Sequence, residues 1–198
     1  MFARFGFAIT GAIALFAATP SFAVSPPVQS FEGAQNSAYK CSLAAAAAEA
    51  RGSATDGDLA ICTMAINLSQ DVKNQLAAAL TNRGVMHLAR AEYDATIADS
   101  NAALAVDAKM PEALVNRGVA HILAGRPKDA VRDLTHGLEL GPAHPERVYF
   151  NRGMAREDSG DITGAYLDYR KASQLDPSWD RPKQELTRFT VVSKAPLS

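Results

Sequence analysis

The chain has no surplus of charge of either sign, and this shortage excludes several classes of protein. Its 20 basic and 21 acidic residues nearly cancel over 198 residues. Such a balance lacks the electrostatic footprint of a nucleic-acid-binding protein and the acidic block of a disordered tail. Beyond the first two dozen residues, no apolar run approaches the roughly 20 residues of a membrane-spanning helix. We therefore expect no nucleic-acid partner, and no membrane insertion once the N-terminal segment has been removed.

The sequence also lacks the patterns by which most enzymes are recognised. It contains no G-x-S-x-G, no H-E-x-x-H and no glycine-rich phosphate loop. His87 and His121 occupy positions where a ring packed between helices is expected. His136 and His144 have no metal-ligand spacing with aspartate or cysteine. We expect no catalysis, no metal and no cofactor; a metal that copurified stoichiometrically with the histidines would reopen the enzymatic alternative.

Residues 1–23 have the composition of a secretory signal peptide. Arg4 supplies a positive charge, positions 5–18 are almost wholly apolar or small, and positions 21–23 form a small-x-small cleavage pattern. An uncleaved membrane anchor is the alternative, which the short apolar core and its two glycines disfavour. No cysteine follows the apolar run, as a bacterial lipoprotein would require. We expect export to the periplasm or secretion, with a mature chain that starts near Val24.

The expected export bears on the redox state of the two cysteines. Cys41 and Cys62 are the only ones in the chain, and in an oxidising compartment a disulfide is the default for such a pair. Two buried free thiols are the alternative. After a leader over 24–34 that we expect to be extended, the pattern predicts two helices within 35–70, hinged near Gly52. The cysteines are almost equally far from that hinge, which places them side by side across an antiparallel pair.

The tripeptide Asn-Arg-Gly occurs three times, at 82–84, 116–118 and 151–153, with intervals of 34 and 35 residues. A period of this length indicates an array of repeated helix pairs. Small residues follow each glycine by 12 and 19 positions, and a glycine that faces a small residue lets two helices approach closely. A proline or polar break ends each unit. The predicted units cover 71–110, 111–144 and 145–179, followed by a capping helix over 180–190 and a tail over 191–198.

This register resembles the tetratricopeptide repeat (TPR) family over residues 77–179, with 41–68 as a degenerate preceding helix pair. The third unit matches the family pattern best, at Tyr149, Gly153, Gly160, Ala165, Tyr169, Ala172 and Pro177. In the first unit Thr96 and Ser100 replace the usual alanine and aromatic residue, and Ala108 replaces the terminal proline. The resemblance implies an all-α, right-handed solenoid of antiparallel helix pairs with a C-terminal capping helix. It also implies that the first helix of each unit lines a concave face.

Each arginine of the tripeptide is followed 16 positions later by an aspartate. The resulting pairs are Arg83 with Asp99, Arg117 with Asp133, and Arg152 with Asp168. The threefold coincidence predicts ion pairs that bridge the two helices of a unit, or adjoining units, and fix their register. A functional charge is the alternative for these arginines.

The asparagines are the candidate ligand-binding residues. On the resembled fold Asn82, Asn116 and Asn151 form a ladder along the groove, where an amide can both donate and accept hydrogen bonds. The alternative is that they satisfy neighbouring backbone inside the array. The strip expected beside them consists of Val85, Val115, Val119, Ile122, Leu123, Phe150 and Met154, with Arg147 as the groove-side cation. Some TPR proteins clamp a terminal carboxylate, but Thr81 and Val85 stand where that clamp has Lys and Asn, which disfavours it here.

An apolar strip with amide rungs suits an extended peptide or an amphipathic helix. The sequence thus predicts a non-catalytic, exported interaction scaffold that binds a protein partner in its groove, in the envelope of a Gram-negative bacterium. The alternative function is self-association, in which exposed helix faces pair two copies and a neighbour or the chain's own leader fills the groove. The oligomeric state stays open at this point.

Overall fold

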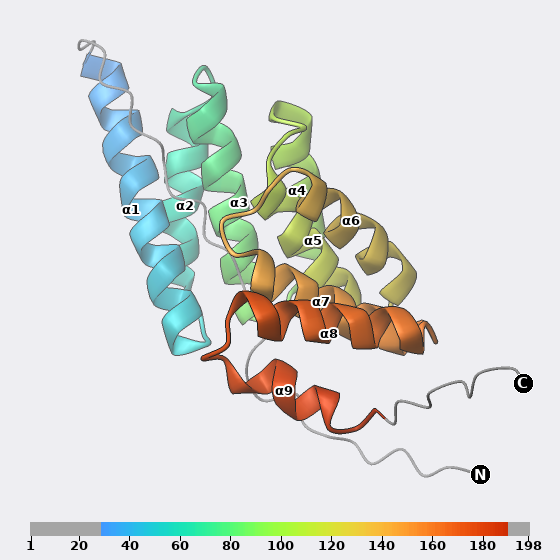
Figure 1. The fold of residues 1–198 in the computed structure, drawn as a ribbon. Helices are drawn as coiled ribbons and strands as arrows, with labels where there is room; N and C mark the ends of the chain where they lie inside the picture. Colours follow the sequence, from blue (N-terminus) through green and yellow to red (C-terminus); the bar gives the residue numbers. More distant parts are fainter. Residues whose placement is uncertain (1–28, 190–198) are drawn as a thin grey trace, which may run out of the picture.

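The computed structural model describes residues 29–189, which form nine helices and no strand (Figure 1). The helices are α1 (Gln29–Arg51), α2 (Asp56–Leu68), α3 (Lys73–Ala89), α4 (Tyr93–Val106), α5 (Pro111–Leu123), α6 (Pro127–Glu139), α7 (Pro145–Asp158), α8 (Ile162–Leu175) and α9 (Asp180–Leu186). Four antiparallel pairs stand side by side, and α9 lies against the last pair. The expected all-α solenoid is confirmed for this part of the chain.

The ends of the helices follow from proline and from left-handed turn residues. α5, α6 and α7 begin at Pro111, Pro127 and Pro145, because proline lacks only an N–H that has no partner in the first turn of a helix. The turn inside each unit needs a left-handed residue. Glycine supplies it in the second and third units, whereas Ala91 adopts φ 59° in the first. An alanine in this conformation costs about 1–2 kcal/mol.

The buried side chains form three clusters along the array. One cluster joins the first helix pair to the first unit, a second connects the three units, and a third closes the C-terminal end. In the third cluster Trp179, Leu186 and Phe189 pack against Phe150 and Tyr169. The predicted packing of the final helix on the third unit is therefore confirmed.

Two predicted boundaries are wrong. α1 begins at Gln29, so residues 29–34 are helical and not extended; no proline lies between them and the rest of the helix to stop it from extending backwards. α9 ends at Leu186 and not at 190, and its last turn is followed by an irregular turn. The predicted signal peptide, the first part of the leader (24–28) and the tail over 191–198 lie outside the described residues.

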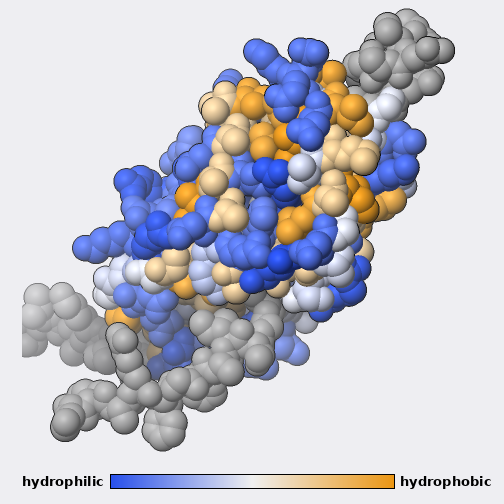
Figure 2. Space-filling model, turned by 180° about the vertical axis from the view of Figure 1, so that it is seen from behind, coloured by the Kyte–Doolittle hydropathy of each residue, from blue (hydrophilic) through white to orange (hydrophobic). Residues whose placement is uncertain are grey.

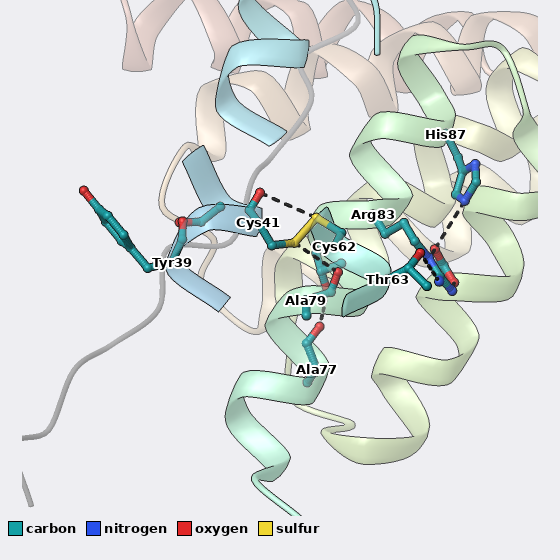
Figure 3. Close-up of a disulfide and its surroundings, with 11 residues drawn as sticks. Tyr39, Cys41, Cys62, Thr63, Ala77, Ala79, Arg83 and His87 are labelled. Carbon is teal, nitrogen blue, oxygen red and sulfur yellow. Dashed lines mark hydrogen bonds and ion pairs between the residues drawn. A yellow bond between two sulfur atoms is a disulfide. The ribbon is translucent and has the colours of Figure 1, made fainter. Parts of the chain in front are cut away.

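The disulfide between Cys41 and Cys62 is confirmed (Figure 3). It joins α1 to α2 with a Cα–Cα distance of 4.6 Å, and both cysteines are fully buried. The Sγ atom of Cys41 lies 3.7 Å from the carbonyl oxygen of Ala79 in α3. The bridge thus sits where the first helix pair meets the first unit.

The repeated glycines do not simply face small residues, as the sequence suggested. A β-carbon added at Gly118 would lie 2.8 Å from Leu134 Cγ, and one added at Gly153 would lie 2.8 Å from Tyr169 Cε1. At Gly84 the nearest atoms, on Asp99 and Thr96, are 3.8 Å away. Two of the three glycines therefore make room for a large side chain of the second helix, and the first has room to spare.

This difference predicts opposite effects of the same substitution in two repeats. Gly153→Ala should lower the free energy of unfolding by about 1–3 kcal/mol, as overpacking of a core does. The ring of Tyr169 cannot move aside, because Phe150 and Phe189 pack against it with centroids 5.5 Å and 5.9 Å away. Gly84→Ala should be neutral or raise stability by up to about 1 kcal/mol, since alanine favours a helix. Urea unfolding followed by circular dichroism measures both; equal losses in the two variants would contradict the assignment.

Candidate functional site

The three predicted arginine–aspartate pairs are all formed. They are Arg83–Asp99, Arg117–Asp133 and Arg152–Asp168, each with two hydrogen bonds of 2.7 to 2.8 Å from Nε and Nη2 to the two carboxylate oxygens. Each pair joins the first helix of a unit to the second helix of the same unit. Two parallel bonds to a largely buried carboxylate fix both distance and orientation. Their structural interpretation is therefore supported by the geometry.

Each of these arginines also reaches the preceding helix pair, which the sequence did not reveal. Nη1 of Arg83 donates to Thr63 of α2 at 3.2 Å (Figure 3). In the second unit, Nη1 of Arg117 donates to Asn101 of α4 at 2.6 Å. In the third unit, Nη1 of Arg152 donates to Thr135 of α6 at 3.2 Å. The sequence separations of these contacts are 20, 16 and 17 residues. Because the spacing is not constant, the contacts could not be predicted from the repeat pattern. One guanidinium thus connects three helices in two successive layers.

In each unit, the residue four positions after the arginine contacts the aspartate that pairs with that arginine. His87 and His121 place Nε2 3.7 Å from Asp99 and Asp133, which confirms that both rings pack between helices. Nδ1 of His87 also contacts Glu92 at 2.6 Å. The second unit has arginine in place of that glutamate, and Nδ1 of His121 is buried without a hydrogen-bond partner. Burial lowers the pKa of His121 below its usual value, which favours the neutral ring.

A cavity of about 370 Å³ opens beside this second cluster. It is lined by Ile97, Asn101, Arg117, His121, Asp129, Arg132 and Asp133. The lining mixes both signs of charge, and its two arginines pair with its two aspartates. None of the predicted partner-binding residues borders it. The cavity therefore belongs to the arginine–aspartate scaffold.

The asparagines lie inside the array and not on an open face. Asn82 is 1% exposed, and Asn116 and Asn151 are 0% exposed. The expectation of an accessible ladder is wrong in this structure, because all three side chains are buried where the helices of the array pack together. The alternative, amides held within the array, describes their placement. Their role in partner binding is untested and stays a prediction.

Most of the predicted apolar strip is also core. Val85, Val115, Val119, Ile122 and Phe150 are buried, and the middle three belong to the cluster that connects the units. Phe150 packs against Tyr169 and Trp179, with ring centroids 5.5 Å and 4.8 Å away, and Arg181 lies over its ring. The strip cannot present these side chains to a ligand while the units are packed in this way. Leu123 and Met154 remain partly accessible.

Arg147 is the predicted groove residue that stays most accessible, with its side chain 42% exposed. It lies in the first turn of α7, and its Nη1 is 3.6 Å from Oε1 of Glu49 in the last turn of α1. Burial raises the pKa of Glu49, although the nearby Arg147 side chain opposes this effect. The contact brings α1 to the third unit, across the side that the resemblance assigns to the groove.

The positions of a carboxylate clamp are closed as well. Thr81 is fully buried, and its hydroxyl donates to the carbonyl oxygen of Ala77 at 2.9 Å and lies 3.0 Å from Met110 Sδ. Val85 is fully buried too.

Among the described residues, no group of three or more His, Cys, Asp or Glu is arranged to hold a metal ion. No helix between positions 29 and 189 has both the length and the hydropathy to cross a membrane.

Several solved structures share this architecture. The first TPR domain of human RPAP3, solved by NMR, has a TM-score of 0.54 and 23% identity, over 57% of this chain and 87% of that one. The first TPR of Spaghetti (RPAP3), bound to the HSP90 peptide SRMEEVD, has the same TM-score and identity, over 57% and 88%. The Sgt2 TPR domain from Aspergillus fumigatus follows with 0.52 and 26%, over 57% and 75%. The chain therefore has the fold of a TPR domain.

Sequence comparisons reach less far. No protein-family model matches the chain. A mouse protein described as FK506-binding protein-like is 32% identical over 72 residues, which is 36% of this chain but only 20% of the mouse protein. The similarity thus spans about a fifth of that relative's length and says nothing of the rest of it.

Proposed function

We propose that this chain is a non-catalytic interaction scaffold that binds a segment of a partner protein on the side of the array where Arg147 lies. The observation that carries the proposal is the set of three helix pairs locked in phase by two-bond arginine–aspartate contacts. Such locking produces a rigid surface, and a preformed surface binds a flexible segment without first having to be ordered itself. The peptide-bound TPR domain with the same fold supports this mode of action.

The proposed contact residues are those that remain accessible. Arg147 and Met154 are seven positions apart on α7, which places them on one side of the helix, and Leu123 ends α5. Glu49 faces Arg147 at 3.6 Å, beyond the range of a good hydrogen bond. A carboxylate of a partner can replace Glu49 there and gain a closer contact. We therefore propose a ligand that carries an acidic residue beside apolar ones.

The ligand is proposed to be an internal segment or a helix and not a free C-terminus. Thr81 and Val85 are buried where a carboxylate clamp needs accessible polar side chains. An internal segment offers side chains in place of a terminal carboxylate, and it can use both the cation and the apolar residues. A peptide with an amidated C-terminus should consequently bind as well as its free-acid form.

Binding can be tested without a known partner by selecting 12-residue peptides from a random display library on the wild-type chain. The peptides obtained should bind Arg147→Glu at least tenfold more weakly by isothermal titration calorimetry. Arg132→Glu is the matched control, because Arg132 is an exposed arginine on a different helix, α6; it should change affinity less than twofold. If Arg147→Glu bound the peptides as tightly as the wild type, at an unchanged melting temperature, the result would contradict the proposed site.

We also propose that the chain is exported, to the periplasm or medium of a Gram-negative bacterium. The support is the disulfide of Cys41 and Cys62, because disulfides persist in oxidising compartments and are rare in reducing ones. The signal-like residues 1–23 point the same way. Fractionation of expressing cells followed by mass spectrometry should recover a chain that starts near Val24 outside the cytoplasm. A full-length cytoplasmic product with both thiols free would contradict export.

A further inference from the structure

The second unit differs from its neighbours at the residue that precedes the second helix of each unit. This position holds Glu92 in the first unit, Arg126 in the second and Asp161 in the third. It is the N-cap of α4, α6 and α8 in turn. Two of the three units therefore have a carboxylate at this place, whereas the second unit has a positive charge.

The backbone places this N-cap residue in the same way in all three units. Its N–H donates to the carbonyl oxygen five positions earlier, at 2.9 Å in the first unit and at 2.8 Å in the other two. The acceptors are His87, His121 and Arg156, the residues that contact the paired aspartate of each unit. A side chain at the N-cap is therefore next to the same neighbour in every unit.

In the first and third units the N-cap carboxylate contacts this neighbour. Oε2 of Glu92 lies 2.6 Å from Nδ1 of His87, and Oδ2 of Asp161 lies 3.6 Å from Nε of Arg156. The longer glutamate side chain makes the closer contact. A carboxylate beside the third residue after the repeated glycine is thus a recurring part of the array.

The second unit has the same ring in the same orientation, but no carboxylate at its N-cap. His87 and His121 both place Nε2 3.7 Å from the paired aspartate, so the two rings are oriented alike. Nδ1 of His121 is buried and has no hydrogen-bond partner among the described residues. A buried polar atom without a partner lowers stability. A group that supplies the partner should therefore bind favourably.

Arg126 brings a positive charge close to this ring. Its Nη2 donates to Oδ1 of Asp94 at 2.7 Å, but the side chains of Arg126 and Asp94 are 42% and 91% exposed. Exposed pairs of this kind contribute little to stability, so the guanidinium can turn to another carboxylate at small cost. Burial is the main cause of the lowered pKa of His121, and the nearby charge of Arg126 contributes to it.

We propose that the second unit binds the carboxylate of an acidic side chain of a partner protein, between Nδ1 of His121 and the guanidinium of Arg126. The partner thereby supplies the carboxylate that Glu92 and Asp161 supply in the neighbouring units. Glutamate should fit better than aspartate, because Glu92 reaches its ring at 2.6 Å whereas Asp161 stays 3.6 Å from its arginine. The inference goes beyond the proposed contact at Arg147 of α7 and does not depend on it.

The surroundings of His121 suit a charged group better than an apolar one. His121 borders the cavity of about 370 Å³, and six of the seven residues that line this cavity are polar or charged. Seen from behind, hydrophobic residues gather toward the side of α1, and the surface away from α1 is largely hydrophilic (Figure 2). The side chain of His121 is 13% exposed, and the cavity beside it has room for the residue that carries the carboxylate.

Two small probes test the site. N-acetyl-glutamate amide has its single carboxylate on the side chain, and N-acetyl-glutamine amide is its uncharged isostere. NMR of the full 198-residue chain follows the ring signals of His121 as each probe is added. The glutamate probe should bind about tenfold or more tightly than the glutamine probe, which is the effect of one charged hydrogen bond. It should also raise the pKa of the ring, because a nearby negative charge favours the protonated form.

Arg126→Glu places in the second unit the carboxylate that the first unit has. It should raise the pKa of His121 without a probe and abolish the response to the glutamate probe. Arg126→Gln is the matched variant, because it also loses the contact with Asp94 but adds no carboxylate. It should bind the probe more weakly than the wild type and melt below Arg126→Glu. Arg147→Glu should leave the response at His121 unchanged, which separates this test from that of the contact at Arg147.

Equal affinities for the two probes would overturn the proposal. So would an Arg126→Glu variant in which the pKa of His121 and the response to the glutamate probe match those of the wild type. If acetate bound as tightly as the glutamate probe, the site would accept any small anion, and the assignment to a protein side chain would be wrong.

Discussion

Asp168→Ala should lower the free energy of unfolding by about 3–5 kcal/mol, the range for removing one partner of a buried ion pair. Asp168 is nearly inaccessible and accepts hydrogen bonds from Arg152 at 2.8 Å through both oxygens, and from Arg156 at 2.9 Å. Alanine leaves two guanidinium groups without their acceptor. Neither can turn fully to water, because their side chains are 12% and 23% exposed. Equilibrium denaturation in urea measures the loss.

Asp94→Ala is the appropriate control for this prediction. Asp94 also accepts a hydrogen bond from an arginine, Arg126, at 2.7 Å, but its side chain is 91% exposed. Exposed ion pairs contribute about 0–1 kcal/mol, so this variant should remain close to the wild type. If both aspartates gave the same small change, the arginine–aspartate contacts would not be what holds the units together.

Replacing Cys41 and Cys62 together by alanine should reduce stability by about 3 kcal/mol. The bridge closes a loop of 21 positions, and restricting a loop of this size in the unfolded chain is worth about that much on the chain-entropy model. Alanine at both sites avoids leaving a buried polar group. The measurement is again urea denaturation, performed under non-reducing conditions.

A reductant provides the internal control for the disulfide. The wild-type chain should lose a similar stability once mass spectrometry shows that its bridge is open, whereas the double alanine variant should not respond. An unchanged stability of the reduced wild type would mean that packing of α1 on α2 and α3 holds the first pair without the bridge.

The features that could be predicted from sequence are those that repeat with a constant spacing. Arginine and aspartate recur 16 positions apart in every unit because both lie on helices of one rigid pair, so their phase survives in the sequence. The cysteines were paired from their equal distance to the turn near Gly52. In both cases the two partners belong to one helix pair, whose geometry is set by a short connection.

The features that could not be predicted depend on how successive layers approach. Asn116 lies on the first helix of its unit as expected, but the sequence does not say how closely the neighbouring helices pack over its side chain. The contact of Arg147 with Glu49 joins α7 to α1, which are separated by five helices in the chain. No local sequence pattern predicts a contact over such a distance. The third partners of the arginines fall at irregular separations because the connections between units differ in length.

The arginines that span two layers bear on how the array comes apart. Thr63, Asn101 and Thr135 each accept a hydrogen bond from a guanidinium that belongs to the next layer, so when one layer melts, its neighbour loses one hydrogen bond while its arginine stays paired with its own aspartate. In a one-dimensional array the coupling between neighbours, compared with the stability of each repeat, decides whether repeats melt singly or together. Here the coupling favours a single cooperative transition over stepwise unravelling. A substitution that destabilises one end of the array should then lower the stability of all of its repeats.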